Sequence, residues 1–201
     1  MVASKTAVCN LALDILLQAP LTNVDTDNTP ESRWFVRNYD QVRDAELRKH
    51  AWHFAIRRVN VTVDATAPSH GDWLYRYAYP SDCMRILPPR YDGKFEAYPI
   101  PHEVEADSSG NRWLYTNQTT PLELRYIFQI TDVTKFDPLF VDALAAKLAM
   151  KGAHRFTGKQ SMIETASGMY AEAIAEARRA NAIEGIPERP YDDDVIEARY
   201  Q

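Results

Sequence analysis

The pattern of hydrophobic and polar residues predicts two helices within the first 50 residues. Between residues 4 and 18, apolar residues recur every three or four positions and polar residues occupy the other side, as in an amphipathic helix. We expect this helix to end before Pro20. Thr29-Pro30-Glu31 is a typical helix start, because the hydroxyl can cap the first turn and proline fits the first helical position. The second helix is predicted to run to about Arg48.

The spacing then changes to alternation, which predicts strands between Ala55 and Val133. Turn residues such as Asp92-Gly93 and Ser109-Gly110 separate the alternating runs. Tyrosines are concentrated between Tyr75 and Tyr126, as expected of a β-rich module. Residues 122–128 are predicted to form one of its strands.

Helical spacing returns at Asp137-Pro138, where aspartate can cap and proline can start a helix. Residues 139–156 are apolar around most of the circumference, which predicts a central buried helix that ends at Gly158. Ser161 and Glu164 have the spacing of a capping box for a last helix, to about residue 182. We therefore predict an α+β chain: an α-helical bundle of about four helices (1–54 and 136–182) with an inserted antiparallel β domain (55–135).

The charge is concentrated at the C-terminal end. The 201 residues carry a formal net charge of −5, and residues 183–201 alone contain six acidic and two basic side chains. This predicts an extended, solvated acidic tail over 183–201. A sequence pI near 5.5 disfavours general electrostatic capture of nucleic acid by the whole surface, without excluding a local basic patch. Two cysteines, no secretory signal and no membrane-length apolar run lead us to expect a soluble chain made in a reducing cytoplasm.

The sequence contains no recognisable catalytic motif. It lacks a phosphate-binding loop, a dinucleotide-binding glycine pattern and a Gly-x-Ser-x-Gly elbow. His50 and His53 have helical spacing, but no nearby carboxylate or cysteine completes a metal site. Four acids of the tyrosine-rich segment could form a glycosidase pair, although exposed turn acids are the simpler interpretation: Asp72, Asp82, Glu103 and Glu105. We expect no enzyme activity, no cofactor and no metal.

A short basic segment is the remaining candidate for binding. Arg48, Lys49, Arg57 and Arg58 place four positive charges with no acid between them. They could contact phosphates, or they could pair with acids of a neighbouring element or subunit. Because Arg57 and Arg58 are consecutive on a predicted strand, they should point to opposite faces and cannot both line one channel. We predict that all four face protein, and we treat them as subunit-interface candidates.

Four stretches of the chain together resemble the head-to-tail adaptors of short-tailed phages, the tail tubular protein A family. One is an opening helix and another contains His50-Ala51-Trp52-His53-Phe54. The third is an aromatic strand followed by Pro80-Ser81-Asp82-Cys83, and the fourth leads through Asp137-Pro138 into a helix. The C-terminal segment is similar to acidic segments of these adaptors, except that Val195 stands where an aromatic residue is expected. The four stretches are Asn10–Leu16, Tyr39–Arg58, Trp73–Arg85 and Tyr126–Ala149.

The resemblance implies a structural virion protein and not an enzyme. Such adaptors form a dodecameric ring that connects the portal protein to the tail nozzle, near the tail fibre proteins, and that lines the DNA ejection channel. This chain would be found in the virion tail, would assemble in the host cytoplasm and would be monomeric before it meets the portal. The alternative is a carbohydrate-binding or glycan-degrading tail protein that uses the aromatic β domain. The residues expected to bind the portal are Asp192, Asp193, Asp194, Ile196, Arg199 and Tyr200.

Overall fold

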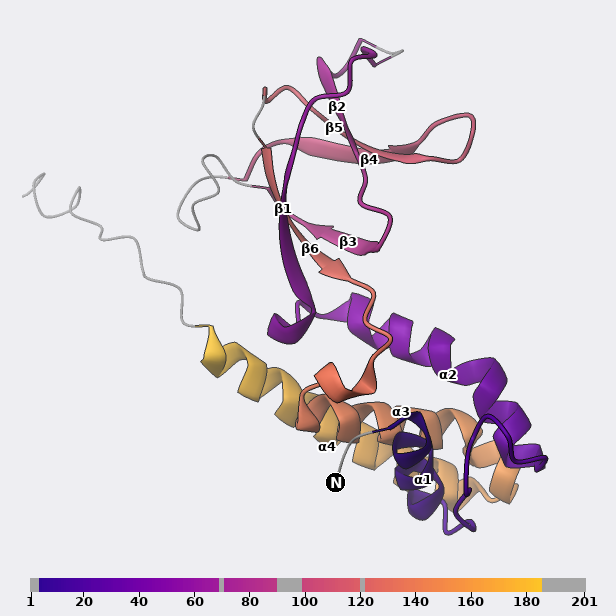
Figure 1. The fold of residues 1–201 in the computed structure, drawn as a ribbon. Coiled ribbons are helices and arrows are strands. Elements are labelled where there is room, and N and C mark those ends of the chain that lie inside the picture. Colours follow the sequence, from indigo (N-terminus) through magenta and orange to yellow (C-terminus); the bar gives the residue numbers. More distant parts are fainter. Residues whose placement is uncertain (1–3, 69–70, 90–98, 120–121, 186–201) are drawn as a thin grey trace, which may run out of the picture. The chain divides into compact units, whose positions relative to one another are not determined.

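The computed structural model describes residues 4–68, 71–89, 99–119 and 122–185 (Figure 1). These residues form four helices and two small antiparallel three-stranded sheets, which confirms the predicted α+β class. They divide into two compact units. The helical unit comprises residues 4–56 and 127–184, and the β unit comprises Arg57–Tyr126. In the part of the chain described, no helix is long and apolar enough to cross a bilayer.

The first two helices begin at side-chain caps. Helix α1, Lys5–Ile15, starts at Ser4, whose hydroxyl accepts a bond from the Ala7 N–H. It ends before residue 18, where the pattern predicted its end, because Leu17 adopts a left-handed conformation with φ of 55°. Helix α2, Pro30–Lys49, starts as predicted at Thr29, whose Oγ1 accepts from the Ser32 N–H over 3.1 Å.

Helix α3, Pro138–Thr157, is largely buried, as its sequence predicts. The Asp137 carboxylate caps it by accepting from the Leu139 N–H over 2.8 Å, and Gly158 ends it with φ of 62°. The helix contacts α1, α2 and α4. Ten of its residues are buried, because small and apolar side chains surround most of its axis.

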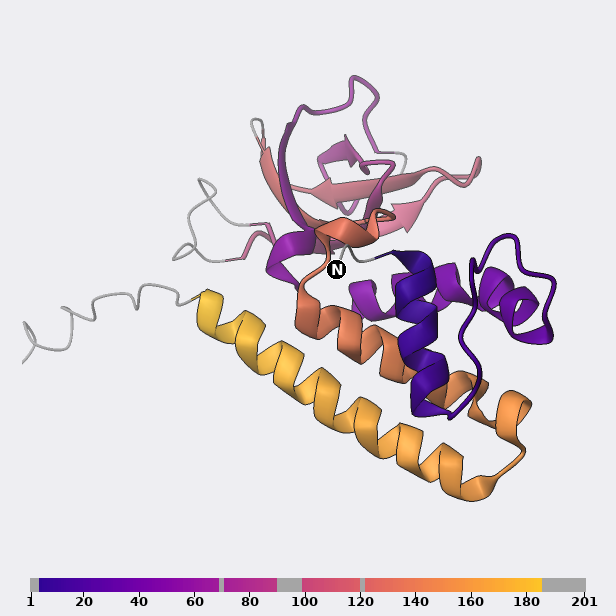
Figure 2. The same cartoon turned by 60° about the horizontal axis from the view of Figure 1, so that its bottom comes forward.

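Helix α4, Gln160–Glu184, lies alongside α3 (Figure 2). The predicted capping box at its start is wrong. Ser161 lies inside the helix, and the Glu164 carboxylate accepts a hydrogen bond from the Gln160 side-chain amide over 3.2 Å. A glutamate that is engaged four residues back along the helix surface does not cap the first turn. The described chain continues only to Gly185, one residue beyond α4.

The β unit contains two sheets that share one hydrophobic core. One sheet has the order β1-β6-β3, from Ile56–Val61, Leu122–Phe128 and Cys83–Leu87. The other has the order β2-β5-β4, from Tyr75–Ala78, Arg112–Thr116 and His102–Ala106, with Tyr77 opposite Leu114. Five buried side chains from both sheets and their connections pack together in this core: Tyr77, Ile100, Leu114, Leu122 and Leu124.

Candidate functional site

Lys49 is tied to a buried carboxylate in the helical unit. Its Nζ lies 2.6 Å from Oε1 of Glu46, one turn earlier on α2, and the glutamate is only 2% exposed. The other oxygen, Oε2, accepts from the Tyr170 hydroxyl on α4 over 2.9 Å. The hydrogen bond to Glu46 raises the pKa of Lys49, since it favours the charged amine. Arg48, next to it in the last turn of α2, is exposed.

A second lysine approaches this cluster from α3. The Lys147 Nζ lies 4.2 Å from the centre of the Tyr170 ring, in a cation–π contact. Burial lowers the pKa of Lys147, and repulsion from Lys49 lowers it further. Burial also raises the pKa of Tyr170, as does its hydrogen bond to Glu46. Glu46, Lys49, Lys147 and Tyr170 therefore form a cluster of charged and polar side chains that connects α2, α3 and α4.

Arg57 lies in the β unit and pairs with the Asp82 carboxylate, which precedes β3. The same carboxylate accepts from the Tyr126 hydroxyl on β6 over 3.0 Å. Burial, followed by this hydrogen bond, raises the pKa of Tyr126. Asp82, one of the acids with glycosidase potential, is therefore engaged in a structural ion pair.

Arg58 takes a different partner on the same sheet. Its guanidinium lies 2.6 Å from the Glu123 carboxylate on the neighbouring strand β6. Because Glu123 and Tyr126 are three positions apart on one strand, they lie on opposite faces of it. The contacts of Arg57 and Arg58 thus follow the alternation expected of consecutive strand residues. Both side chains remain about half exposed, 50% for Arg57 and 56% for Arg58.

The two candidate histidines meet an asparagine that sequence reasoning did not single out. The Asn181 amide nitrogen on α4 lies 3.0 Å from Nε2 of His50 and donates to the Ala51 carbonyl. Its oxygen accepts from the backbone N–H of His53 over 2.8 Å. Among the residues that the structure describes, no group of three metal-ligating side chains occurs. The asparagine instead fixes the chain where α2 ends.

A hollow of about 220 Å³ lies beside this asparagine, within the helical unit. Three aromatic and three charged side chains are part of its lining. The Asp137 carboxylate is occupied as the α3 cap. The lining includes Trp52, Phe54, Lys135, Phe136, Asn181 and Glu184.

A larger cleft of about 380 Å³ lies in the β unit, between the β2–β3 connection and the start of β5; we call it the β5 cleft. The Arg112 guanidinium carbon lies 4.7 Å from the centre of the Tyr79 ring, and that of Arg76 lies 4.2 Å from the Trp113 ring. Burial raises the pKa of the Cys83 thiol in the lining, which keeps it uncharged and unlike a reactive nucleophile. The lining includes Tyr79, Pro80, Ser81, Cys83, Arg112 and Trp113.

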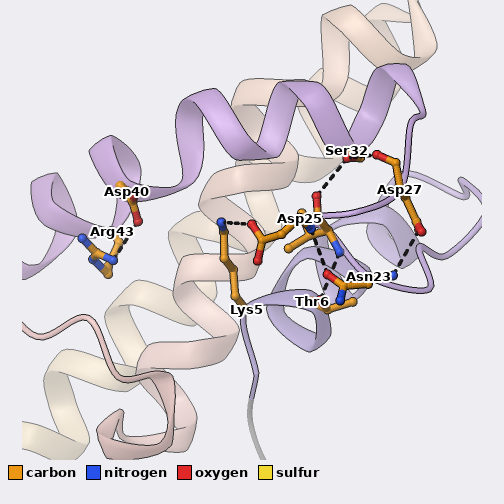
Figure 3. A network of polar contacts seen from close by, with 9 residues as sticks. Lys5, Thr6, Asn23, Asp25, Asp27, Ser32, Asp40 and Arg43 are labelled. Carbon is orange, nitrogen blue, oxygen red and sulfur yellow. Dashed lines mark hydrogen bonds and ion pairs between the residues drawn. The ribbon is translucent and has the colours of Figure 1, made fainter.

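The acids between α1 and α2 stabilise their own loop (Figure 3). Asp25 forms an ion pair of 2.6 Å with Lys5, and the Asp27 carboxylate accepts from the Thr22 and Asn23 N–H groups. The Ser32 hydroxyl donates back to the loop, to the Val24 carbonyl over 2.9 Å. The two carboxylates thus hold the loop to α1 and to itself, and the Ser32 hydroxyl holds it to α2.

Arg43 of the same figure is a buried charge with two partners (Figure 3). It is 4% exposed, and its guanidinium lies 2.8 Å from the Asp40 carboxylate and 2.8 Å from that of Asp44. Gln129 donates to the second oxygen of Asp44 over 2.7 Å. A buried guanidinium with two carboxylates is satisfied internally and is a structural feature of α2.

The six residues expected to bind a portal lie outside the described residues: Asp192, Asp193, Asp194, Ile196, Arg199 and Tyr200. In comparisons with known proteins, no protein-family model and no curated protein matches this chain.

Proposed function

We propose that this chain is a structural virion protein, a head-to-tail adaptor of the tail tubular protein A kind. Twelve copies would form a ring that connects the portal to the tail nozzle and lines the DNA ejection channel. The free chain would be monomeric and would assemble only on the portal, in the host cytoplasm, before it becomes part of the virion tail.

The observation that carries this proposal is the order of the two units along the chain. Residues 4–56 and 127–184 supply one helical unit, and the β unit is inserted between them. The family that the sequence resembles has the same order, a helical bundle interrupted by a β domain. We infer that the four helices form such a bundle, with α3 at its centre.

The outward side of α4 supports packing between copies. Gly168, Ala171 and Ala175 are exposed at spacings of three and four residues on this helix. Small side chains allow another helix to approach closely, which suits the heterologous contacts of a closed ring. The arginines and lysine of the basic segment remain interface candidates, because Arg57 and Arg58 keep exposed surface in addition to their internal ion pairs.

Mass measurement of the purified chain, alone and mixed with purified portal, tests the proposal. We expect a monomer alone and a ring of copies on the portal. A chain that lacks residues 186–201 should keep its helix content in circular dichroism and should lose portal attachment. Absence of any association between the full chain and portals of short-tailed phages would contradict the adaptor function. A stable dodecamer without portal would contradict only the predicted monomeric state.

The alternative function, carbohydrate binding, is favoured by the aromatic lining of the β5 cleft. Sugars bind proteins through stacking on such rings, and Tyr79 and Trp113 supply two. Each ring, however, already carries a guanidinium, from Arg112 and Arg76. Binding of neutral oligosaccharides on a glycan array, abolished by Trp113→Ala, would support this alternative over the adaptor.

A further inference from the structure

The β5 cleft contains a guanidinium without a carboxylate partner in the described part of the chain. Arg112 is exposed at the start of β5 and stacks on Tyr79, and none of the described acids forms an ion pair with it. The neighbouring Arg76 differs, because its guanidinium lies 2.7 Å from the Asp64 carboxylate. Of these two arginines, only Arg76 is neutralised.

Two acids next to the lining residues, Asp107 and Asp82, are engaged elsewhere. Asp107 accepts from the Trp113 indole N–H over 3.0 Å and from the N–H groups of Ser109 and Asn111. Asp82 is held by Arg57 and Tyr126. The Cys83 thiol in the lining is uncharged. The cleft therefore presents one available positive charge next to aromatic walls.

This arrangement fits a short acidic segment, because a guanidinium binds a carboxylate through paired N–H donors. The chain itself contains such a segment, Tyr191-Asp192-Asp193-Asp194. A tethered segment meets its own cleft at a high effective concentration when the linker spans the distance. We propose that the β5 cleft binds residues 191–194 of the same chain.

The inference is independent of the adaptor function, since it concerns the free chain without a portal. If both proposals hold, the C-terminal acids have two successive partners, and the portal must displace them from the cleft. Attachment to a portal would then be faster for a variant in which the cleft cannot hold the segment.

Nuclear magnetic resonance of the full chain tests the contact. The probes are the backbone amides of Asn111 and Arg112 and the indole N–H of Trp113. The D192N/D193N/D194N variant should shift these three signals, and the E184Q/E188Q variant, which removes charges outside the segment, should leave them in place. Unchanged signals in the triple variant, or equal shifts in both variants, would overturn the proposal.

A second experiment uses a synthetic peptide of residues 191–197. Added to the triple variant, it should return the three signals toward their positions in the native chain. Arg112→Ala in the same background should weaken this binding roughly tenfold to a hundredfold, as expected for loss of a charged hydrogen bond. Binding that is indifferent to Arg112 would overturn the proposal. So would native-chain signals that change on dilution, because they would show that a second copy provides the segment.

Discussion

The Tyr170 hydroxyl on α4 donates a hydrogen bond of 2.9 Å to the Glu46 carboxylate on α2, although the two residues are 124 positions apart in the sequence. Glu46 is 2% exposed, and its carboxylate pairs with Lys49 and accepts a hydrogen bond from this hydroxyl. The bond holds the second helix against the last. A buried carboxylate that loses a donor keeps the cost of its desolvation.

Tyr170→Phe should therefore lower the free energy of unfolding by about 1.5–3 kcal/mol, the usual value for a hydrogen bond to a charged group. Tyr39→Phe is the matched control, because the Tyr39 hydroxyl is buried and has no hydrogen-bond partner among the described residues. Its removal should leave stability unchanged or raise it by up to about 1 kcal/mol. Urea unfolding measures both. Equal losses in the two variants would show that the bond to Glu46 adds nothing beyond the general effect of removing a hydroxyl.

Asp107 should make the stability of the β unit depend on pH. The Trp113 indole N–H, and then the N–H groups of the turn, lower the pKa of Asp107 from 3.8 to about 2. A carboxyl whose pKa is lower in the folded state stabilises it above pH 4, and this stabilisation is lost as the pH falls through 2. Asp107→Asn should thus reduce the urea midpoint at pH 6 and have little effect near pH 2.

Asp72→Asn controls for the loss of one negative charge, since Asp72 is exposed and forms no ion pair among the described residues. It should leave the urea midpoint unchanged at both pH values. If the Asp107 variant loses the same stability at pH 2 as at pH 6, the carboxylate charge does not act through these hydrogen bonds.

Two glycine substitutions should have opposite signs. Gly158 ends α3 with φ of 62°, and an added Cβ would meet no atom within 4 Å, so Gly158→Ala should destabilise by about 1 kcal/mol through backbone strain alone. Gly168 lies inside α4, also with open space at its Cβ position, and Gly168→Ala should stabilise by about 0.5–1 kcal/mol. Thermal unfolding of both variants measures the difference. Stabilisation by Gly158→Ala would refute the left-handed cap.

Reversal of the Arg57–Asp82 pair should be better tolerated than its loss. Arg57→Glu places two acids together, but both side chains are partly exposed, so the cost is at most about 1 kcal/mol of stability. The double variant R57E/D82R should recover most of this loss.

We also expect Arg57→Glu to leave DNA binding unchanged, both in affinity, which we expect to be weak, and in the dependence of that affinity on salt concentration. A smaller salt slope, measured by fluorescence anisotropy at several salt concentrations, would show that Arg57 contacts phosphate.

Several boundaries of this fold were predictable from the sequence, because the interactions that decide them span only a few residues. Thr29-Pro30 and Asp137-Pro138 start helices where expected, since each cap bonds to an N–H two or three positions later. Gly158 ends α3 for a similarly local reason. The alternation between Ala55 and Val133 indicated the β unit and hence the α+β class.

The same local signals were insufficient to place the end of α1 and the start of α4, where two of them competed. The apolar stripe predicted α1 as far as residue 18, but the chain turns at Leu17, which is 82% exposed and lies in the left-handed region. Ser161 and Glu164 have capping-box spacing, yet the helix starts earlier and Glu164 bonds to Gln160. Spacing alone does not determine with which of several nearby groups a polar side chain forms its hydrogen bond.

The side-chain contacts of the candidate sites were decided only by the tertiary structure. A hydrophobic pattern shows that a face of α2 is buried, but it does not show that Tyr170 of α4 covers it and reaches Glu46. The charges at Arg57 and Arg112 were visible in the sequence, whereas Asp82 as the partner of Arg57 and the open cleft beside Arg112 were not. The path of the chain brings these distant side chains together, and burial makes a pairing such as that of Tyr170 with Glu46 energetically significant.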